Sequence, residues 1–262
     1  MDFLYEDDEL AITVVNAIRT GDIRSLKRVL AENPGLAAAR IIERGKAAEL
    51  NSRGPSRTLL HLATDWPGHF PDGAATVTAL IESGAEVNAR FTGAHTETPL
   101  HWAASTDDVE VLDALLDAGA DIEAPGAVIA GGTPLDDAVA FAQWRAANRL
   151  VERGARIALW HAAALGHMEA IKNHFAGAGL SERHPWGAQG TMRPDQVNVS
   201  FWCACHGGQQ PPAEYLLERG ADLNWISAWD GLTPLDAATR SRAADLVRWL
   251  RNQGAKTASE LE

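Results

Sequence analysis

Three side chains, Asp137, His161 and Cys203, could carry out acid–base and nucleophilic chemistry together if the fold places them side by side. An aspartate hydrogen-bonded to a histidine, with a cysteine on the far side, has the composition of a nucleophilic triad. Asp137 and His161 could also act without the thiol, as a general base and the group that orients it. Buried polar side chains also pair simply to satisfy each other's hydrogen bonds, so a structural Asp–His pair is the alternative.

The elements that must position these side chains belong to an internal repeat. The tripeptide Thr-Pro-Leu begins at Thr98, Thr133 and Thr233, and Thr58-Leu59-Leu60 is a variant of it. A Gly-Ala pair follows each of the four, and the Thr-to-Gly spacing is the same in three of them. Self-similarity at a period of about 33–35 residues predicts a fold of stacked repeats.

Each repeat reads as two helices followed by an extended turn. The Thr98 hydroxyl can accept a hydrogen bond from a free backbone N–H group, and Pro99 is tolerated in the first helical turn. A second helix carries apolar residues at helical spacing from Val109 to Leu116. Gly119 then ends this helix in the left-handed conformation.

The segment TPLHWAA from Thr98, followed by GAD from Gly119, resembles the ankyrin repeat. The resemblance covers residues 10–257 and implies an all-α solenoid of about seven helix–turn–helix units, with short extended turns and a concave face. It also implies that the chain binds another protein, and that His61 and His101 have an architectural role in bonding neighbouring turns.

We predict a single ankyrin-repeat domain over residues 1–262, with residues 10–50 as its N-terminal capping unit. Two segments depart from the family pattern, an inserted loop at 66–73 and a long connection at 179–198. Long irregular connections inside a compact fold are usually functional or mobile, and we expect both to fold over one face. The predicted repeats span 57–90, 97–123, 132–156, 157–180, 199–224 and 232–257.

The three candidate catalytic residues are assigned to one position of the repeat, four residues after the threonine. It is usually leucine, but we align Asp137, His161 and Cys203 with it in three consecutive units. Neighbouring helices pack about 8–10 Å apart, so equivalent side chains could touch. The units that begin near Ile157 and Val199 lack Thr-Pro, so their alignment could be shifted by one residue.

The first functional hypothesis is a soluble ankyrin-repeat protein that binds a protein partner in its concave, Trp/His-rich groove. Tryptophan is enriched at the energetic centres of interfaces, which favours this hypothesis. The apolar turn around Val128 and Ile129 is either a wall of such a site or a contact for the long loop. The predicted contacts are Asp65, Trp66, Glu97, Phe141, His206, Trp225 and Trp229.

The second hypothesis is a small-molecule-binding protein or an enzyme, with an aromatic pocket under the 179–198 connection. Mainly apolar walls with a few convergent polar groups are typical of ligand sites. Asp137 and His161 would supply proton transfer, and solenoids are rarely catalysts. The predicted walls are Trp102, Trp160, Trp186, Trp202 and Trp225.

Composition narrows the classes of partner and the compartment. The chain has 23 Lys+Arg and 35 Asp+Glu residues and a net charge of −12, which argues against nucleic acid and anionic membranes as partners. It contains no apolar run of membrane-spanning length, and its acidic start is unlike a secretory signal. Two cysteines, Cys203 and Cys205, fit a reducing cytoplasm. We expect no cofactor and no metal, because structural zinc needs four converging ligands.

Overall fold

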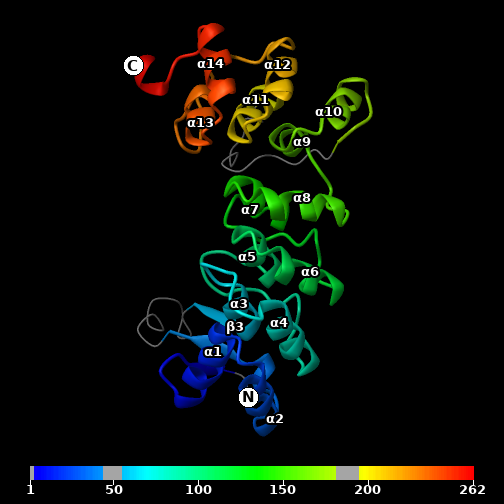
Figure 1. Ribbon diagram of the computed structural model, residues 1–262, viewed down its shortest axis with the longest axis vertical. Coiled ribbons are helices and arrows are strands. Elements are labelled where there is room, and N and C mark those ends of the chain that lie inside the picture. The colour runs from blue at the N-terminus through cyan, green and yellow to red at the C-terminus, as the bar shows by residue number, and fades with distance from the viewer. Residues whose placement is uncertain (1–2, 44–54, 181–194) are drawn as a thin grey trace. The chain divides into compact units, whose positions relative to one another are not determined.

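The computed structural model describes residues 3–43, 55–180 and 195–262 (Figure 1). The chain forms two compact units, Met1–Arg153 and Gly154–Glu262, which are called the N-terminal and C-terminal units below. Both are built from consecutive helix pairs, which confirms the predicted all-α repeat architecture. The single domain over residues 1–262 and the number of seven repeats stay predictions.

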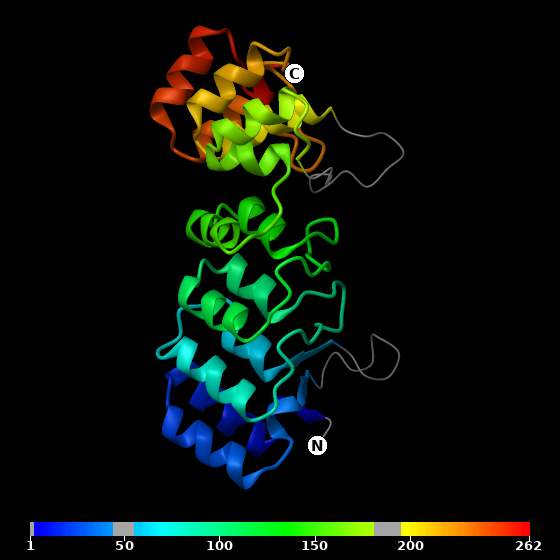
Figure 2. The same cartoon turned by 90° about the vertical axis from the view of Figure 1, so that its right-hand side faces the viewer.

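In the N-terminal unit the helix pairs lie in successive layers (Figure 2), and α5 packs between α3 and α7. In the two Thr-Pro pairs a helix of seven residues precedes one of nine, and a left-handed residue, Asp107 or Ala142, stands between them. The pairs are α1 (Glu9–Thr20) with α2 (Ile23–Glu32), α3 (Leu59–Thr64) with α4 (Gly73–Glu82), α5 (Pro99–Ser105) with α6 (Val109–Asp117), and α7 (Pro134–Ala140) with α8 (Trp144–Glu152).

The C-terminal unit repeats the same design. Its first helices, α9, α11 and α13, pack on one another in that order. A short 3₁₀ helix, Ala258–Glu260, follows the last pair, and most of the predicted 179–198 connection lies outside the described residues. The pairs are α9 (Leu159–Leu165) with α10 (Met168–Phe175), α11 (Gln196–His206) with α12 (Gln210–Leu217), and α13 (Pro234–Arg240) with α14 (Ala244–Asn252).

Buried histidines tie successive layers together, as the family resemblance implied. The Thr98 N–H donates to Nδ1 of His101 (3.1 Å), and Nε2 of His101 bonds the Gly132 carbonyl of the next turn (3.3 Å). His61 makes the same pair of contacts, with Thr58 and with the Glu97 carbonyl. Burial lowers the pKa of His61 to about 3 and that of His101 to about 4, so both rings are neutral.

A small sheet near the N-terminus was not predicted. Strands β1 (Phe3–Tyr5), β2 (Arg40–Ile42) and β3 (Ser56–Thr58) form it in that order, β1–β2 parallel and β2–β3 antiparallel. Arg40 of the central strand β2 holds the edge strand β3 in place, because its guanidinium donates to Ser56 Oγ (2.8 Å) and to the Arg90 carbonyl (2.7 Å). Three-residue strands carry too little alternation to be recognised in a sequence.

The predicted inserted loop at 66–73 lies between α3 and α4 and packs on the turn between α5 and α6. The His69 backbone N–H donates to the Asp108 carboxylate (2.8 Å), and His69 Nε2 lies 3.0 Å from the Thr106 carbonyl. Gly68 has a φ of +74°, and a Cβ there would lie 2.6 Å from the Thr106 side chain. Only glycine fits this close approach without strain.

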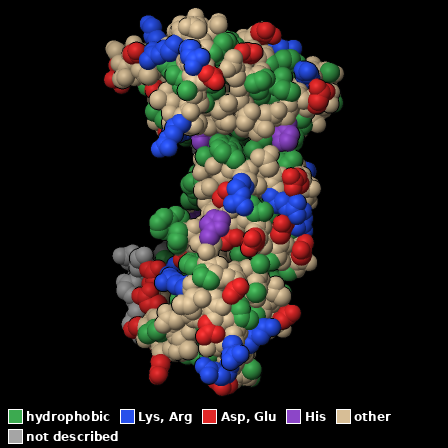
Figure 3. Space-filling view, in the orientation of Figure 1, with side chains coloured by type: hydrophobic (Ala, Val, Ile, Leu, Met, Phe, Trp, Pro, Cys, Tyr) green, Lys and Arg blue, Asp and Glu red, His purple; other side chains and the backbone are tan. Residues whose placement is uncertain are grey.

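Charged side chains of both signs lie on the surface of the N-terminal unit. On the face seen in Figure 3, lysine and arginine side chains are interspersed with aspartate and glutamate. Arg149 of α8 and Arg153, which follows α8, for example, both pair with Asp113 of α6 (2.9 and 2.6 Å). Within the described ranges, no helix has the length and apolar character needed to cross a membrane.

Candidate functional site

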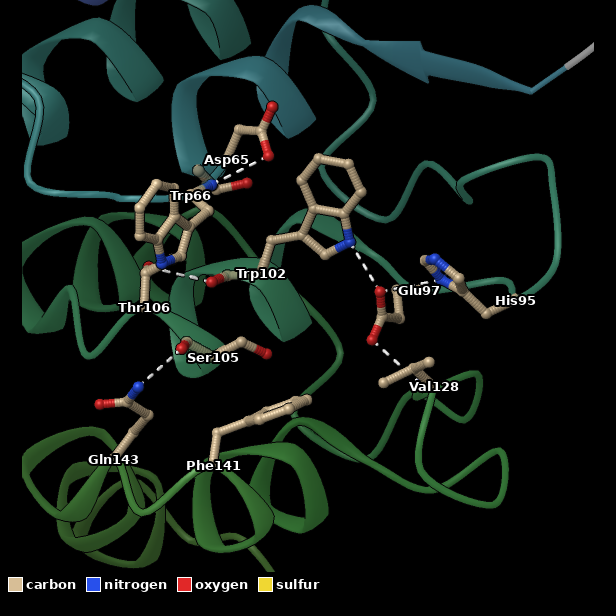
Figure 4. Close-up of a pocket in the computed structure, with 11 residues that line it drawn as sticks. Asp65, Trp66, His95, Glu97, Trp102, Ser105, Thr106, Val128, Phe141 and Gln143 are labelled. Carbon is tan, nitrogen blue, oxygen red and sulfur yellow. Dashed lines mark hydrogen bonds and ion pairs between the residues drawn. The ribbon is translucent and has the colours of Figure 1, made fainter. Parts of the chain in front are cut away.

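A cavity of about 480 Å³ opens in the N-terminal unit, where three successive layers of the repeat meet (Figure 4). The ends of α3, α5 and α7 form one side of it, and the turns that precede α5 and α7 form the other. This space is called the N-terminal cavity below. Its lining residues are Thr64, Asp65, Trp66, His95, Glu97, Trp102, Ser105, Thr106, Val128, Phe141 and Gln143.

Large apolar side chains form the rim of the N-terminal cavity. Trp66 is 80% exposed, Val128 52% and Phe141 45%, although each side chain is large and apolar. Trp66 starts the inserted loop, Val128 belongs to the apolar turn before α7, and Phe141 follows the end of α7. Three separate segments therefore bring exposed apolar surface to one place.

The wall of the cavity contains a buried carboxylate, that of Glu97, which is 5% exposed. Its Oε2 accepts a hydrogen bond from the Trp102 indole N–H (2.8 Å) and lies 2.8 Å from His95 Nδ1. Its Oε1 accepts from the Val128 backbone N–H (3.0 Å). Figure 4 shows Glu97 held between these three groups, and the bond to Val128 connects the turn before α5 to the turn before α7.

Aromatic contacts fix the ring of Trp102 and the imidazole of His95. The Phe91 ring stacks on His95 at 4.5 Å between centroids and tilts against Trp102 at 5.7 Å. The edge of His61 meets Trp102 at 4.9 Å. The indole N–H of Trp102 is therefore aimed at Glu97 by packing on two sides.

Asp137, in α7, is fully buried and interacts with the same carboxylate. Burial first, and then repulsion from Glu97, raise its pKa well above the ordinary value. A backbone hydrogen bond at Ile129 acts in the opposite direction. The arrangement favours the protonated form of Asp137.

The structure brings together six of the residues singled out in the sequence. The N-terminal cavity is lined by all six, although Trp102 was assigned to the second hypothesis: Asp65, Trp66, Glu97, Trp102, Val128 and Phe141. Asp65 is 3.0 Å from Arg57 Nη1, and its Oδ1 accepts from the Trp66 N–H (2.9 Å). The other lining residues were not among the predicted contacts: Thr64, His95, Ser105, Thr106 and Gln143.

The remaining tryptophans singled out in the sequence lie beyond the N-terminal unit. Trp202 is buried, and its indole N–H donates to the Leu232 carbonyl (3.1 Å), much as His101 bonds Gly132. Trp229 meets Trp202 edge-on at 4.9 Å, and Trp225 tilts against Trp229 at 5.5 Å. The buried His206 ring stacks on Trp202. The Trp160 ring tilts over the neighbouring His161 ring. Trp186 lies outside the described residues.

The alignment that placed His161 level with Asp137 is wrong by one residue. The Ala158 N–H donates to Nδ1 of His161 (3.0 Å), as Thr98 donates to His101, so His161 occupies the position before that of Asp137. The equivalent of Asp137 is Ala162, which is fully buried. The missing Thr-Pro of this repeat hid the true start of α9.

The catalytic assignment of Asp137, His161 and Cys203 stays a prediction. Asp137 belongs to the N-terminal unit, and His161 and Cys203 belong to the C-terminal unit. Burial raises the pKa of the Cys203 thiol well above its ordinary value, and a thiol in such surroundings is a weak nucleophile. In the part of the chain that the structure describes, no group of three or more His, Cys, Asp or Glu side chains could hold a metal ion.

A protein-family model matches more than half of the chain. The family model described as ankyrin repeats (3 copies) matches residues 16–126 and 60–160. The matched residues contain every residue that lines the N-terminal cavity. They also contain the three threonine-capped short helices α3, α5 and α7, whose ends form one side of that cavity.

Proposed function

This chain belongs to the ankyrin-repeat family, and we propose that it is a binding protein whose N-terminal cavity takes a segment of a partner protein. Ankyrin repeats generally mediate protein–protein interaction. The proposal places the contact on the concave side of the repeats, where the short first helices and the turns converge. A cytoplasmic location is part of the same proposal, supported by the two free, buried thiols of Cys203 and Cys205.

One observation carries the proposal: Trp66, Val128 and Phe141 are exposed around a single cavity. Exposed apolar side chains that gather at one place mark interaction sites more often than scattered ones do. Tryptophan is among the residues that most often dominate the free energy of protein binding. A stable complex buries about 800 Å² on each partner, so the segment must extend beyond the cavity along the neighbouring layers.

A selection experiment with a matched control tests the proposal. Random linear peptides displayed on phage are selected on the wild-type chain of residues 1–262, and the affinities of the enriched peptides are measured for Trp66→Ala and Phe141→Ala. We expect each substitution to weaken binding at least about tenfold, the loss that one interface anchor of about 1.4 kcal/mol produces.

The control is Phe3→Ala, because Phe3 is exposed to nearly the same extent (46%) as Phe141 (45%) but lies on β1. Its affinity for the same peptides should equal that of the wild type. Peptides that bind all three variants equally well, or a selection that enriches none, would contradict the proposal.

A small molecule is the second candidate occupant, because about 480 Å³ is within the size range of ligand pockets. The aromatic pocket predicted under the 179–198 connection stays a prediction, because most of that connection lies outside the described residues. Stabilisation of the wild type, but not of Trp102→Ala, in a metabolite screen would favour it over a protein segment.

A further inference from the structure

The N-terminal cavity combines aromatic rings with a buried carboxylate, and we infer that the partner segment inserts a lysine side chain into it. The ammonium group faces the rings of Trp66 and Trp102 and the carboxylate of Glu97. This inference rests on the proposed function, because it names the chemistry of the group that the cavity binds. It is carried by the composition of the wall, the charge balance around Glu97 and the hydrogen bonds that Glu97 already makes.

The aromatic rings favour a cation. The faces of tryptophan and phenylalanine rings attract a positive charge within about 6 Å of the ring centre, and tryptophan does so most strongly. Trp66, Trp102 and Phe141 come from three successive layers and surround one space (Figure 4). A lysine side chain also has an apolar stem that can lie against Val128 at the rim while its charged end enters.

The charge balance of the wall favours a cation as well. The Trp102 indole and the Val128 backbone, which donate hydrogen bonds to Glu97, are both uncharged, so neither brings a positive charge to the carboxylate. His95 Nδ1 lies 2.8 Å from Oε2, and among the described residues no lysine or arginine forms an ion pair with Glu97. The other acid of the wall, Asp65, is different because Arg57 balances it at 3.0 Å.

The existing hydrogen bonds of Glu97 favour lysine over arginine. A guanidinium prefers a carboxylate edge with two free oxygens, to which it can donate in parallel. Both oxygens of Glu97 already accept from the protein, so that edge is occupied. An ammonium is a compact charge that gains from the nearby carboxylate and keeps its water at the open side of the cavity. The net charge of −12 adds a long-range attraction for a basic segment.

The tryptophan indole resonances of the chain of residues 1–262 test the inference directly. Nα-acetyl-lysine methylamide and its uncharged analogue Nα-acetyl-norleucine methylamide are titrated into ¹⁵N-labelled protein at constant ionic strength. The Nε1–H signals of Trp66 and Trp102 are assigned with Trp66→Phe and Trp102→Phe. Trp102 reports on the site itself, because its N–H is bonded to Glu97.

We expect the lysine amide to move both signals along a saturating curve, with at least fivefold tighter binding than the norleucine amide. Equal binding of the two amides, or no movement with the lysine amide, would overturn the inference. Tighter binding of the matching arginine amide would overturn the choice of lysine.

Two glutamate variants separate the local charge from the net charge. Glu97→Gln should bring the lysine amide to within twofold of the norleucine amide, while the norleucine amide itself binds as it does to the wild type. That unchanged binding shows that the cavity is intact in the variant. Glu82→Gln removes the same charge from the exposed surface of α4, where Glu82 lies 4.0 Å from Lys27, and should leave the lysine preference unchanged. A preference that survives Glu97→Gln contradicts the inference.

The inference and the proposed function fail in different ways. Selected peptides that need Trp66 and Phe141 but contain no required lysine would overturn the inference and leave the proposed function standing. A lysine amide that binds at Trp102, combined with a selection that enriches no peptide, would contradict the proposed function and leave the cation site standing.

Discussion

The indole Nε1–H of Trp102 donates a 2.8 Å hydrogen bond to Oε2 of Glu97, and both residues line the N-terminal cavity. Trp102 belongs to α5, whereas Glu97 lies in the turn that precedes it. The Val128 backbone then connects the same carboxylate to the next turn. The cavity wall and the stacking of the layers therefore depend on the same buried group.

The first prediction is that Trp102→Phe destabilises the chain by about 1–3 kcal/mol, because Glu97 loses one donor while it stays buried. Phenylalanine keeps most of the aromatic packing against His61 and Phe91, so most of the loss should come from the missing hydrogen bond. Urea denaturation followed by circular dichroism measures the effect. Trp102→Phe in a Glu97→Leu background should cost clearly less, and an equal cost in both backgrounds would contradict this explanation.

The second prediction separates binding from folding at Trp66. Because Trp66 is 80% exposed, Trp66→Ala should change the free energy of unfolding by less than about 0.5 kcal/mol. The same variant should lose at least about tenfold in affinity for the peptides selected on the wild type. Thermal unfolding and isothermal titration calorimetry measure the two effects. A variant that loses stability and affinity together would show that Trp66 is structural.

The third prediction concerns the inserted loop. Gly68→Ala should destabilise the chain by about 1–3 kcal/mol, because the new Cβ meets Thr106 and the residue has a positive φ. Gly231→Ala is the matched control, since Gly231 has a φ of +70° but a Cβ added there would have no atom within 4 Å. It should cost only the strain of the backbone, about 1 kcal/mol. Equal losses for the two variants would show that the loop yields to the added methyl group.

The fourth prediction is a pH dependence that comes from His101. Burial lowers its folded pKa to about 4, below the unfolded value of about 6.5, so the unfolded state binds more protons between these values. Its contribution to stability is therefore complete above about pH 6.5 and is lost as the pH falls towards about 4, by roughly 3 kcal/mol in total.

In His101→Asn that loss should be absent, because the side-chain amide can still accept from Thr98 but does not titrate. Denaturant midpoints are measured from about pH 7 down to about pH 5, a range in which few carboxylates change charge. They give the slope of stability against pH for the wild type and for His101→Asn. The same slope in both would rule out His101 as the source of the pH dependence.

The fifth prediction has the opposite sign and concerns Asp137. Burial and Glu97 raise the pKa of Asp137 in the folded state above its unfolded value, so the folded state binds more protons between these two values. Stability therefore falls as the pH rises from the unfolded pKa to the folded pKa. Asp137→Asn, which mimics the protonated acid, should therefore be more stable than the wild type at neutral pH. This difference should shrink as the pH falls towards about 4.

Asp113→Asn is the control for Asp137. Burial raises the pKa of Asp113, but hydrogen bonds from Arg149 and Arg153 outweigh it and lower the pKa overall. The contribution of Asp113 is therefore present at neutral pH and is lost as the pH falls through its folded pKa. Asp113→Asn should be less stable than the wild type at pH 7, and a loss of stability in both variants would contradict the protonated state of Asp137.

Much of the fold could be predicted from local patterns alone. The spacing of Thr-Pro-Leu and Gly-Ala marks where helices begin and end, since capping and left-handed residues act within one helical turn. The architectural role of His61 and His101 followed from the same repeated motif, and the contacts with Glu97 and Gly132 confirm it. The apolar turn at Val128 stood out because a solvated turn does not need a valine.

The tertiary structure decided what the repeat pattern could not. His161 lies at the histidine position of its layer because the Ala158 N–H bonds it, although Ala158 offers no side-chain cap that would mark the start of α9. Glu97 and Val128 meet because two turns far apart in the chain stack side by side, and His95 joins them by packing on Phe91. Local periodicity therefore determined the helices and their caps, whereas long-range packing determined which side chains share a cavity, since that depends on contacts between layers and not on any one repeat.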